Sequence, residues 1–169
     1  MKTRGQLAWP RITAWLVDWL CILIWALALV PVGLLVRGHD LPVWALNVGA
    51  FLVLIFPVTL WLAWRESARG ATPGKRLRGL LVVSAQSGGS ASFGRTLTRN
   101  VLKLTVPWEL GHTVAYGFAT QSDPGVWLIA VSIILYAVVL VWLASLFRRI
   151  SPYDAIAGTR VERRSGPPS

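Results

Sequence analysis

Of the 169 residues, 54% are hydrophobic and only 14% are charged, whereas a soluble domain carries about a quarter charged residues. The formal net charge is +10, but the basic residues flank apolar blocks and form no separate basic domain. This placement argues against nucleic-acid binding and favours contact with the anionic headgroups of a lipid bilayer.

Four apolar blocks are long enough to cross the hydrocarbon core of a bilayer, which takes about 20 helical residues. The first, 12–36, carries Asp18 as its only charge, and the second, 43–64, contains none. The fourth, 126–147, is also uncharged and is followed directly by two arginines. The third, 101–119, is the weakest, and whether it is one helix or is broken at its proline stays open. It contains Lys103, Pro107, Glu109 and His112.

Basic residues alternate in number along the connections between these blocks. Three precede the first block, one lies in the first connection, eight lie in 65–103, none in 120–125, and five follow the last block. The excess of Lys and Arg on the cytoplasmic side of membrane proteins places both ends and the long connection inside. Both ends on one side require an even number of crossings, so the weak third block is expected to cross as well.

The expected fold is therefore an all-α membrane protein with four transmembrane helices and both termini cytoplasmic. We expect a multi-pass protein of the plasma membrane, of the bacterial inner-membrane type. Residues 8–162 are expected to form the transmembrane domain, and 163–169 a disordered tail.

The long connection is expected to have structure of its own. Residues 80–84 predict a short strand that ends in a Gln-Ser-Gly-Gly-Ser turn, and Ser92 can cap a helix that begins at Phe93. One face of that helix is apolar, and a different face is basic, with Arg95, Arg99 and Lys103. Such a pattern predicts an amphipathic helix on the membrane surface, with its cations toward the headgroups.

Charged residues inside membrane spans are costly and need a reason. Asp18 follows Arg11 by seven residues, so both side chains project from one face, about 10 Å apart along the axis. Arg11 can reach the cytoplasmic boundary, whereas Asp18 must meet water, a cation or a donor inside the protein. Two interpretations remain open: a proton or cation site, or a carboxylate held by Arg11 or by a polar group on another span.

Glu109 and His112 lie three residues apart on one expected helix, so their side chains can meet. They can bind a metal if further carboxylates join them, act as a proton-handling pair, or simply satisfy each other. Asp18 is the one other carboxylate expected inside the spans, so we predict no metal and no cofactor. His39 in the outer connection is interpreted as a solvated residue.

No catalytic motif stands out. The glycine-rich segment 70–76 resembles a phosphate loop, but it is one residue short and lacks the Ser or Thr that holds magnesium. We interpret it as a tight turn with cations at headgroup level. A nucleophile elbow of the Gly-x-Ser-x-Gly type is also absent, and the single cysteine, Cys21, excludes an intrachain disulfide. An enzyme is therefore not the expected function.

Four sequence features together resemble the RDD family, which is named for one arginine and two aspartates. They are Pro10-Arg11, Asp18, the Thr-Pro-Gly-Lys-Arg segment at 72–76, and Tyr-Asp-Ala-Ile-Ala-Gly-Thr at 153–159. By position, Arg11, Asp18 and Asp154 match the three residues of the name. Tyr153 departs from the family pattern, which usually has histidine there, and the segment 108–112 is not part of that pattern.

The resemblance implies a transport-like membrane protein, since some members of the family are reported as sodium/proton exchangers. In that interpretation Asp18 alternates between a protonated and a cation-bound form, and Asp154 closes the cytoplasmic mouth by pairing with Arg11. Four spans leave little room for a pathway, so a homo-oligomer is expected. The transported species, a proton or a monovalent cation, cannot be chosen from one carboxylate.

Two other interpretations remain. In the first, the protein is a non-catalytic membrane scaffold or assembly factor, and Arg11, Asp18 and Asp154 form a structural ion-pair network. In the second, it is a metal-dependent membrane enzyme that uses Glu109 and His112.

Overall fold

A computed structural model describes residues 7–36, 39, 41–120, 125–145, 147 and 150–164. Lys2, Arg4, Arg37, Arg148 and Arg149, which entered the charge count above, lie outside these residues. In chain order the elements are α1 (Ala8–Ala28), α2 (Val30–Val36), α3 (Val43–Ala50), η1 (Phe51–Ile55), α4 (Phe56–Arg69), α5 (Pro73–Leu77), β1 (Leu80–Ser84), α6 (Phe93–Asn100), η2 (Val101–Thr105), α7 (Val106–Thr120), α8 (Val126–Ser145), α9 (Pro152–Ala157) and β2 (Thr159–Arg163).

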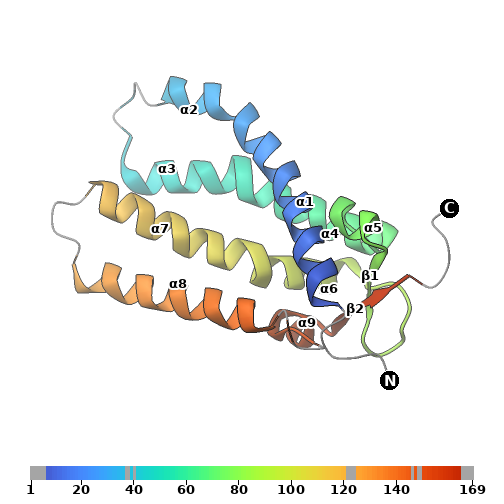
Figure 1. Cartoon of the computed structure of the whole chain (residues 1–169). Coiled ribbons are helices and arrows are strands. Elements are labelled where there is room, and N and C mark those ends of the chain that lie inside the picture. The colour runs from blue at the N-terminus through green and yellow to red at the C-terminus, as the bar shows by residue number, and fades with distance from the viewer. Residues whose placement is uncertain are drawn as a thin grey trace.

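Three helical stretches in the described part of the chain are long and apolar enough to cross a membrane. They are α1, the continuous helix Val43–Arg69 and α8. Helix α7 has 15 residues and continues the helical path of α6 and η2, so the expected third span is helical throughout. In Figure 1, α3–α4, α7 and α8 run side by side, while α1 runs diagonally across the view.

Prolines explain where these helices deviate from regular geometry. The π-helical segments η1 and η2 each end one residue before an X-Pro pair, at Phe56-Pro57 and Val106-Pro107. Proline lacks an N–H and its ring collides with the carbonyl four residues earlier, so a wider turn keeps the helix continuous. The third block is therefore not broken at Pro107. Before Pro31 the chain instead leaves the helix at Leu29, so the expected single helix 12–36 is in fact α1 and α2.

The surface of α8 is that of a helix in lipid. Among its side chains only Leu128 and Ser145 are buried, and large apolar residues on all sides are exposed. Val126 is 83% exposed, Tyr136 70% and Leu140 64%. Contiguous apolar surface of this extent is not stable in water. The chain is therefore built as a membrane protein, and α8 agrees with the predicted fourth span within the described residues.

The short elements gather at one end of the long helices, around the start of α1 (Figure 1). There β1 pairs with β2 antiparallel, from Leu80 opposite Arg163 to Ser84 opposite Thr159. Leu80, Val82, Ala91 and Val161 form a small core with Ala14 of α1, and Leu7 packs against it. The strand 80–84 is confirmed. Its partner β2 was not predicted, and Arg163, expected in a disordered tail, is the last residue of that strand.

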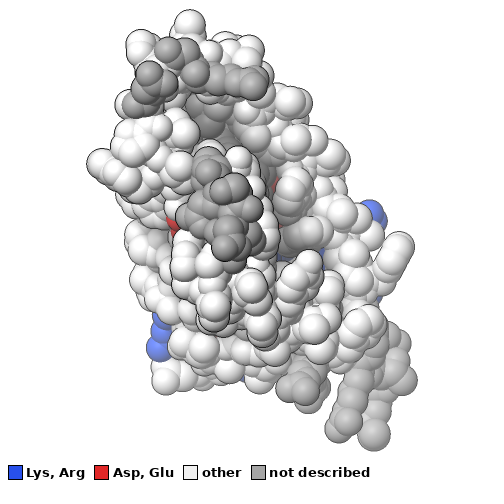
Figure 2. All heavy atoms as spheres, turned by 90° about the vertical axis from the view of Figure 1, so that its left-hand side faces the viewer, with Lys and Arg blue, Asp and Glu red and all other residues white. Residues whose placement is uncertain are grey.

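At the opposite end of the long helices lie α2, the start of α3, the end of α7 and the start of α8. Figure 2 shows that face as mostly white, with Lys and Arg atoms mainly at its margins. Most of the described basic residues lie instead on α4, α5, α6 and β2, the elements that form the sheet or contact it.

The expected amphipathic surface helix is wrong in its orientation. Helix α6 begins at Phe93, as predicted, although the side chain of Ser92 at its N-cap makes no capping hydrogen bond. The basic face of the helix turns toward the protein. Arg95 donates to Ser84 Oγ and Gln86 Oε1, and Arg99 is only 2% exposed. The same pattern of basic residues in a sequence fits a helix whose cations contact headgroups and one whose cations contact buried carboxylates. Here the carboxylates come from segments that are distant in the sequence.

Candidate functional site: a buried charge network beside a cavity

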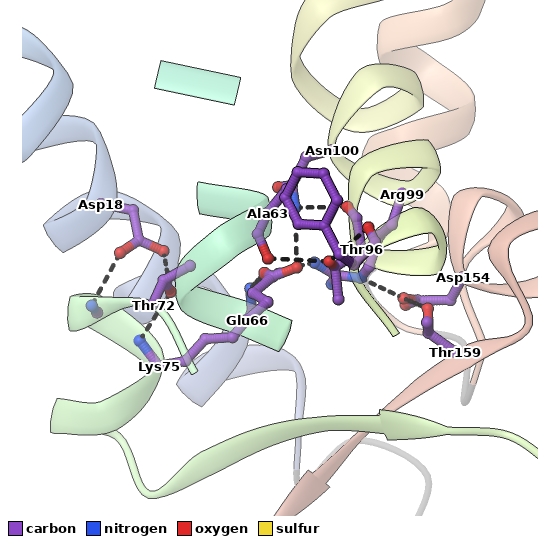
Figure 3. Close-up of polar contacts among 12 residues, drawn as sticks. Asp18, Ala63, Glu66, Thr72, Lys75, Thr96, Arg99, Asn100, Asp154 and Thr159 are labelled. Atoms are coloured by element: carbon purple, nitrogen blue, oxygen red, sulfur yellow. Dashed lines mark hydrogen bonds and ion pairs between the residues drawn. The ribbon is translucent and has the colours of Figure 1, made fainter. Parts of the chain in front are cut away.

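Asp18 is held by the long connection between the second and third apolar blocks rather than by another span. Thr72 Oγ1 donates to Asp18 Oδ2 at 2.6 Å, and Gly74 N donates to Asp18 Oδ1 at 2.8 Å (Figure 3). Thr72 also caps α5, because its side chain accepts from Lys75 N at 3.4 Å. The segment that resembles a phosphate loop thus does receive an anion at its backbone, but the anion is the protein's own carboxylate.

Gly74 allows this contact because it has no side chain. A Cβ at this position would lie 1.9 Å from the carbonyl oxygen of Ala14 and 3.0 Å from Asp18 Oδ1. The backbone of α5 therefore rests directly on α1, and α5 is the principal packing partner of that helix. The interpretation of 70–76 as a turn at headgroup level is corrected in one respect: Lys75 is buried, whereas Arg76 is exposed.

Glu66 is the centre of a second group of buried polar contacts. Its side chain is fully buried near the end of α4 and forms an ion pair with Lys75. Arg99 Nη1 donates to Glu66 Oε1 and Asn100 Nδ2 to Glu66 Oε2, both at 2.8 Å. One carboxylate thereby joins α4, α5 and α6, and Figure 3 shows these side chains converging from the three elements.

Asp154 connects the same network to the C-terminal segment. Arg99 Nε donates to Asp154 Oδ1 at 2.6 Å, and Thr159 Oγ1 donates to the same oxygen at 3.0 Å. The guanidinium of Arg99 also lies 5.5 Å from the ring centre of Tyr153, and that ring packs edge-on against Trp142. Asp154 is 1% exposed, and its Oδ2 has no hydrogen-bond partner among the described residues.

A cavity of about 350 Å³ adjoins this network. Arg11, Asp18 and Asp154, the three residues singled out from the sequence, all line it. Arg11 is buried and is attracted electrostatically by Asp154. The structure therefore brings the three together at one cavity, but the direct ion-pair partner of Asp154 described above is Arg99, which the sequence analysis assigned to the membrane surface.

Two cations outside the membrane-spanning helices have shifted pKa values. Burial lowers the pKa of Lys75, and attraction to Glu66 opposes this only in part, so the pKa falls from 10.5 to about 8. For Arg99 burial acts in the same direction but is outweighed by attraction to Asp154 and Glu66, which raises its pKa above the ordinary value. Arg99 is thus a permanent cation in the network, whereas Lys75 can lose its proton.

Glu109 and His112 are not part of this site. Both lie on α7, where the ring of His112 is 4.9 Å from that of Trp108 and 5.8 Å from that of Tyr116. Glu109 Oε1 is buried and has no hydrogen-bond partner in the part of the chain that is described. Among those residues no group of three or more His, Cys, Asp or Glu side chains could hold a metal ion.

The sequence analysis overlooked Glu66 and misplaced Arg99. One signal was available for Glu66: it lies two residues beyond the end of the second apolar block, and it is one of only seven acidic residues beside 17 basic ones. The second helix runs on to Arg69, five residues beyond the predicted end at 64, and thereby carries Glu66 within its last turns. No local signal pairs it with Arg99, because that partner lies 33 residues away.

Comparison with known proteins supports the family that the sequence motifs indicated. Neither the curated proteins nor the solved structures contain a significant match. The model of the RDD family matches residues 6–158, which is nearly the whole chain and includes Arg11, Asp18 and Asp154. The chain therefore belongs to the RDD family of membrane proteins.

Proposed function

We propose that this RDD protein crosses the plasma membrane four times, with both termini in the cytoplasm. Support comes from the helical path 93–120, which packs against α4 and α8, and from the gathering of basic residues at the end that holds the sheet. Labelling of single cysteines in intact cells, on a Cys21→Ser background, tests the topology. A membrane-impermeant maleimide should label His39→Cys directly and Ser87→Cys only after lysis. Equal labelling of both before lysis would contradict the arrangement.

Within that topology we propose a non-catalytic scaffold or assembly role. In this role the charge network holds α1, α4, α5, α6 and α9 together on the cytoplasmic side. The observation that carries this proposal is the state of Asp18: both carboxylate oxygens are already occupied by donors from α5. Asp18 thus has protein donors where an exchanging carboxylate would bind a cation, and four cations line the same cavity. Arg11, Asp18 and Asp154 then act as one structural unit with Glu66 and Arg99.

Substitution of Asp18 tests this role. Asparagine can keep both contacts, since its amide oxygen accepts from Gly74 and the Thr72 hydroxyl can accept from its N–H. Leucine can keep neither, and it leaves buried donors unsatisfied at about 1–3 kcal/mol each. We expect a normal folded yield for Asp18→Asn and a strongly reduced yield for Asp18→Leu. Both should be compared by size-exclusion profile after expression at equal levels.

Ion exchange is the second candidate, and a different residue favours it. Asp154 Oδ2 is buried, lacks a partner among the described residues and belongs to a side chain that lines the cavity. Such an oxygen can accept a proton or bind a monovalent cation. In this case a homo-oligomer would have to complete the pathway.

Proteoliposomes distinguish the two candidates by sodium-dependent proton movement. The scaffold role predicts that native protein does not exceed empty liposomes. Exchange by the native protein that disappears in folded Asp154→Asn or folded Asp18→Asn, at equal protein density, would overturn the scaffold role and favour exchange.

A further inference from the structure

The cavity beside the network has one charged end and one apolar wall. At the charged end lie four cations, Arg11, Lys75, Arg99 and Lys103, together with the carboxylates Asp18 and Asp154. The cations therefore exceed the carboxylates by two. When Glu66, which binds two of these cations, is included, one positive charge remains in excess.

Lys103 is the cation whose charge the network leaves uncompensated. It lies one helical turn beyond Arg99, so its side chain extends along the same face into the cavity. Among the described residues no carboxylate lies within ion-pairing distance of its ammonium group. An ammonium group in such a position attracts an anion of a ligand.

The apolar wall of the cavity is accessible from the lipid side of the molecule. It is formed by α1 and α8, and includes Trp15, Val139 and Leu143. These three side chains are 43%, 39% and 53% exposed. In a bilayer such exposed apolar surface meets acyl chains, so a lipid can enter sideways with its headgroup at the charged end.

Asp154 adds a requirement for the headgroup. Its unpartnered Oδ2 lies in a nine-tenths buried side chain on the cavity wall, and a carboxylate oxygen only accepts hydrogen bonds. An occupant with a phosphate alone would leave this oxygen unsatisfied. A headgroup that carries a phosphate and a hydroxyl donor fits both the cations and the carboxylate oxygen.

We propose that this cavity binds one anionic phospholipid of the cytoplasmic leaflet, of the phosphatidylglycerol type. Its phosphate lies near Lys103 and Arg11, a glycerol hydroxyl donates to Asp154 Oδ2, and an acyl chain lies against α1 and α8. The choice of leaflet rests on the topology proposed above, whereas the binding itself can occur in a scaffold and in an exchanger alike.

Native mass spectrometry of the full chain, delipidated in a maltoside detergent, tests this site. We expect phosphatidylglycerol to bind about tenfold more tightly than phosphatidylcholine, because both carry a phosphate but choline has no hydroxyl to donate to Asp154 Oδ2; a tenfold difference equals about 1.4 kcal/mol. Lys103→Gln should lower phosphatidylglycerol affinity by about tenfold. The matched control is Arg78→Gln, which removes an exposed cation outside the cavity and should leave the affinity unchanged.

A second variant keeps the test independent of charge. Leu143→Trp fills the apolar part of the cavity and should abolish phosphatidylglycerol binding without changing net charge. Equal binding of both lipids, or native affinity in both Lys103→Gln and Leu143→Trp, would overturn the proposal. Soluble glycerol phosphate should give no thermal stabilisation; if it protects the protein as well as the lipid does, the occupant is a soluble phosphate and a lipid is ruled out.

Discussion

Replacement of Glu66 by glutamine removes one negative charge from the centre of the network and keeps the side-chain volume. Glutamine can still accept from Asn100, but Lys75 and Arg99 lose their common carboxylate. Removing one member of a buried ion pair costs about 3–5 kcal/mol, because the partner stays buried with its charge uncompensated. The two cations here respond differently, which allows the cost to be divided between them.

Lys75 can escape its part of the cost by losing a proton. Its native pKa is about 8, so at pH 7 the loss of the proton costs about one pKa unit, which equals about 1.4 kcal/mol. That value is the upper limit for the Lys75 share. Arg99 cannot deprotonate and loses one charged hydrogen bond, worth about 1.5–3 kcal/mol, but keeps Asp154. The expected total at pH 7 is about 3–4 kcal/mol.

The same reasoning predicts a pH dependence. Above pH 8 Lys75 is neutral in the native protein as well, so the loss of Glu66 no longer affects its protonation. The effect of Glu66→Gln should then fall by about 1.4 kcal/mol between pH 7 and pH 9. The coupling free energy in a double-mutant cycle of Glu66→Gln with Lys75→Met should vanish over the same interval.

Reversible unfolding in mixed detergent micelles, followed by circular dichroism, measures these differences. Glu162→Gln is the matched control, since Glu162 forms an exposed ion pair with Arg160 and its loss should cost less than about 1 kcal/mol. A Glu66→Gln effect as small as that of the control would refute the central role of Glu66. A coupling with Lys75 that is unchanged at pH 9 would refute the division of the cost.

Two further predictions concern Gly74 and Lys75 of α5. Gly74→Ala should abolish the folded state or lower its stability by at least about 3 kcal/mol, because the new Cβ meets the Ala14 carbonyl at 1.9 Å. Gly94→Ala is the control: its Cβ has open space around it, so the variant should be neutral or more stable by up to about 1 kcal/mol. An equal loss of stability in both variants would contradict the close contact between Gly74 and Ala14. The native pKa of Lys75, about 8, lies below its ordinary value of 10.5, so the folded state releases this proton at a lower pH than the unfolded state does. The free energy of unfolding should therefore rise with pH between 8 and 10.5, by about 3.4 kcal/mol at most. A pH titration of unfolding should show this rise in the native protein but not in Lys75→Met, and an equal slope in both would exclude Lys75 as its source.

The predicted membrane class and most helices agree with the structure because they depend on local properties. Hydropathy over about 20 residues identified α8 and the helix that begins at Val43, and a run of β-branched and aliphatic residues identified β1. The errors at helix ends also have local causes. The break at Leu29 follows from Pro31, and the extension of α4 to Arg69 shows that a helix can continue beyond its apolar block when its polar residues have buried partners.

The candidate site was predicted only in part. Motif positions identified Arg11, Asp18 and Asp154, and all three line one cavity. Their contacts could not be predicted, because the partners of Asp18 lie 54 and 56 residues away and the partner of Asp154 lies 55 residues away. Glu66 was missed for the same reason: nothing in its own segment shows that Arg99 and Asn100 approach it.

The sequence by itself determined that this chain is a helical membrane protein of the RDD family, since apolar length and motif order are properties of the chain in one dimension. Only the tertiary structure decided which charges meet. A buried carboxylate is stable only with donors close to it in space, and those donors come from whichever segments the packing of α1, α4, α5, α6 and α9 brings together. Asp18 therefore accepts a hydrogen bond from the segment that begins α5, and Arg99 forms ion pairs with Glu66 and Asp154. Neither set of contacts follows from the order of residues.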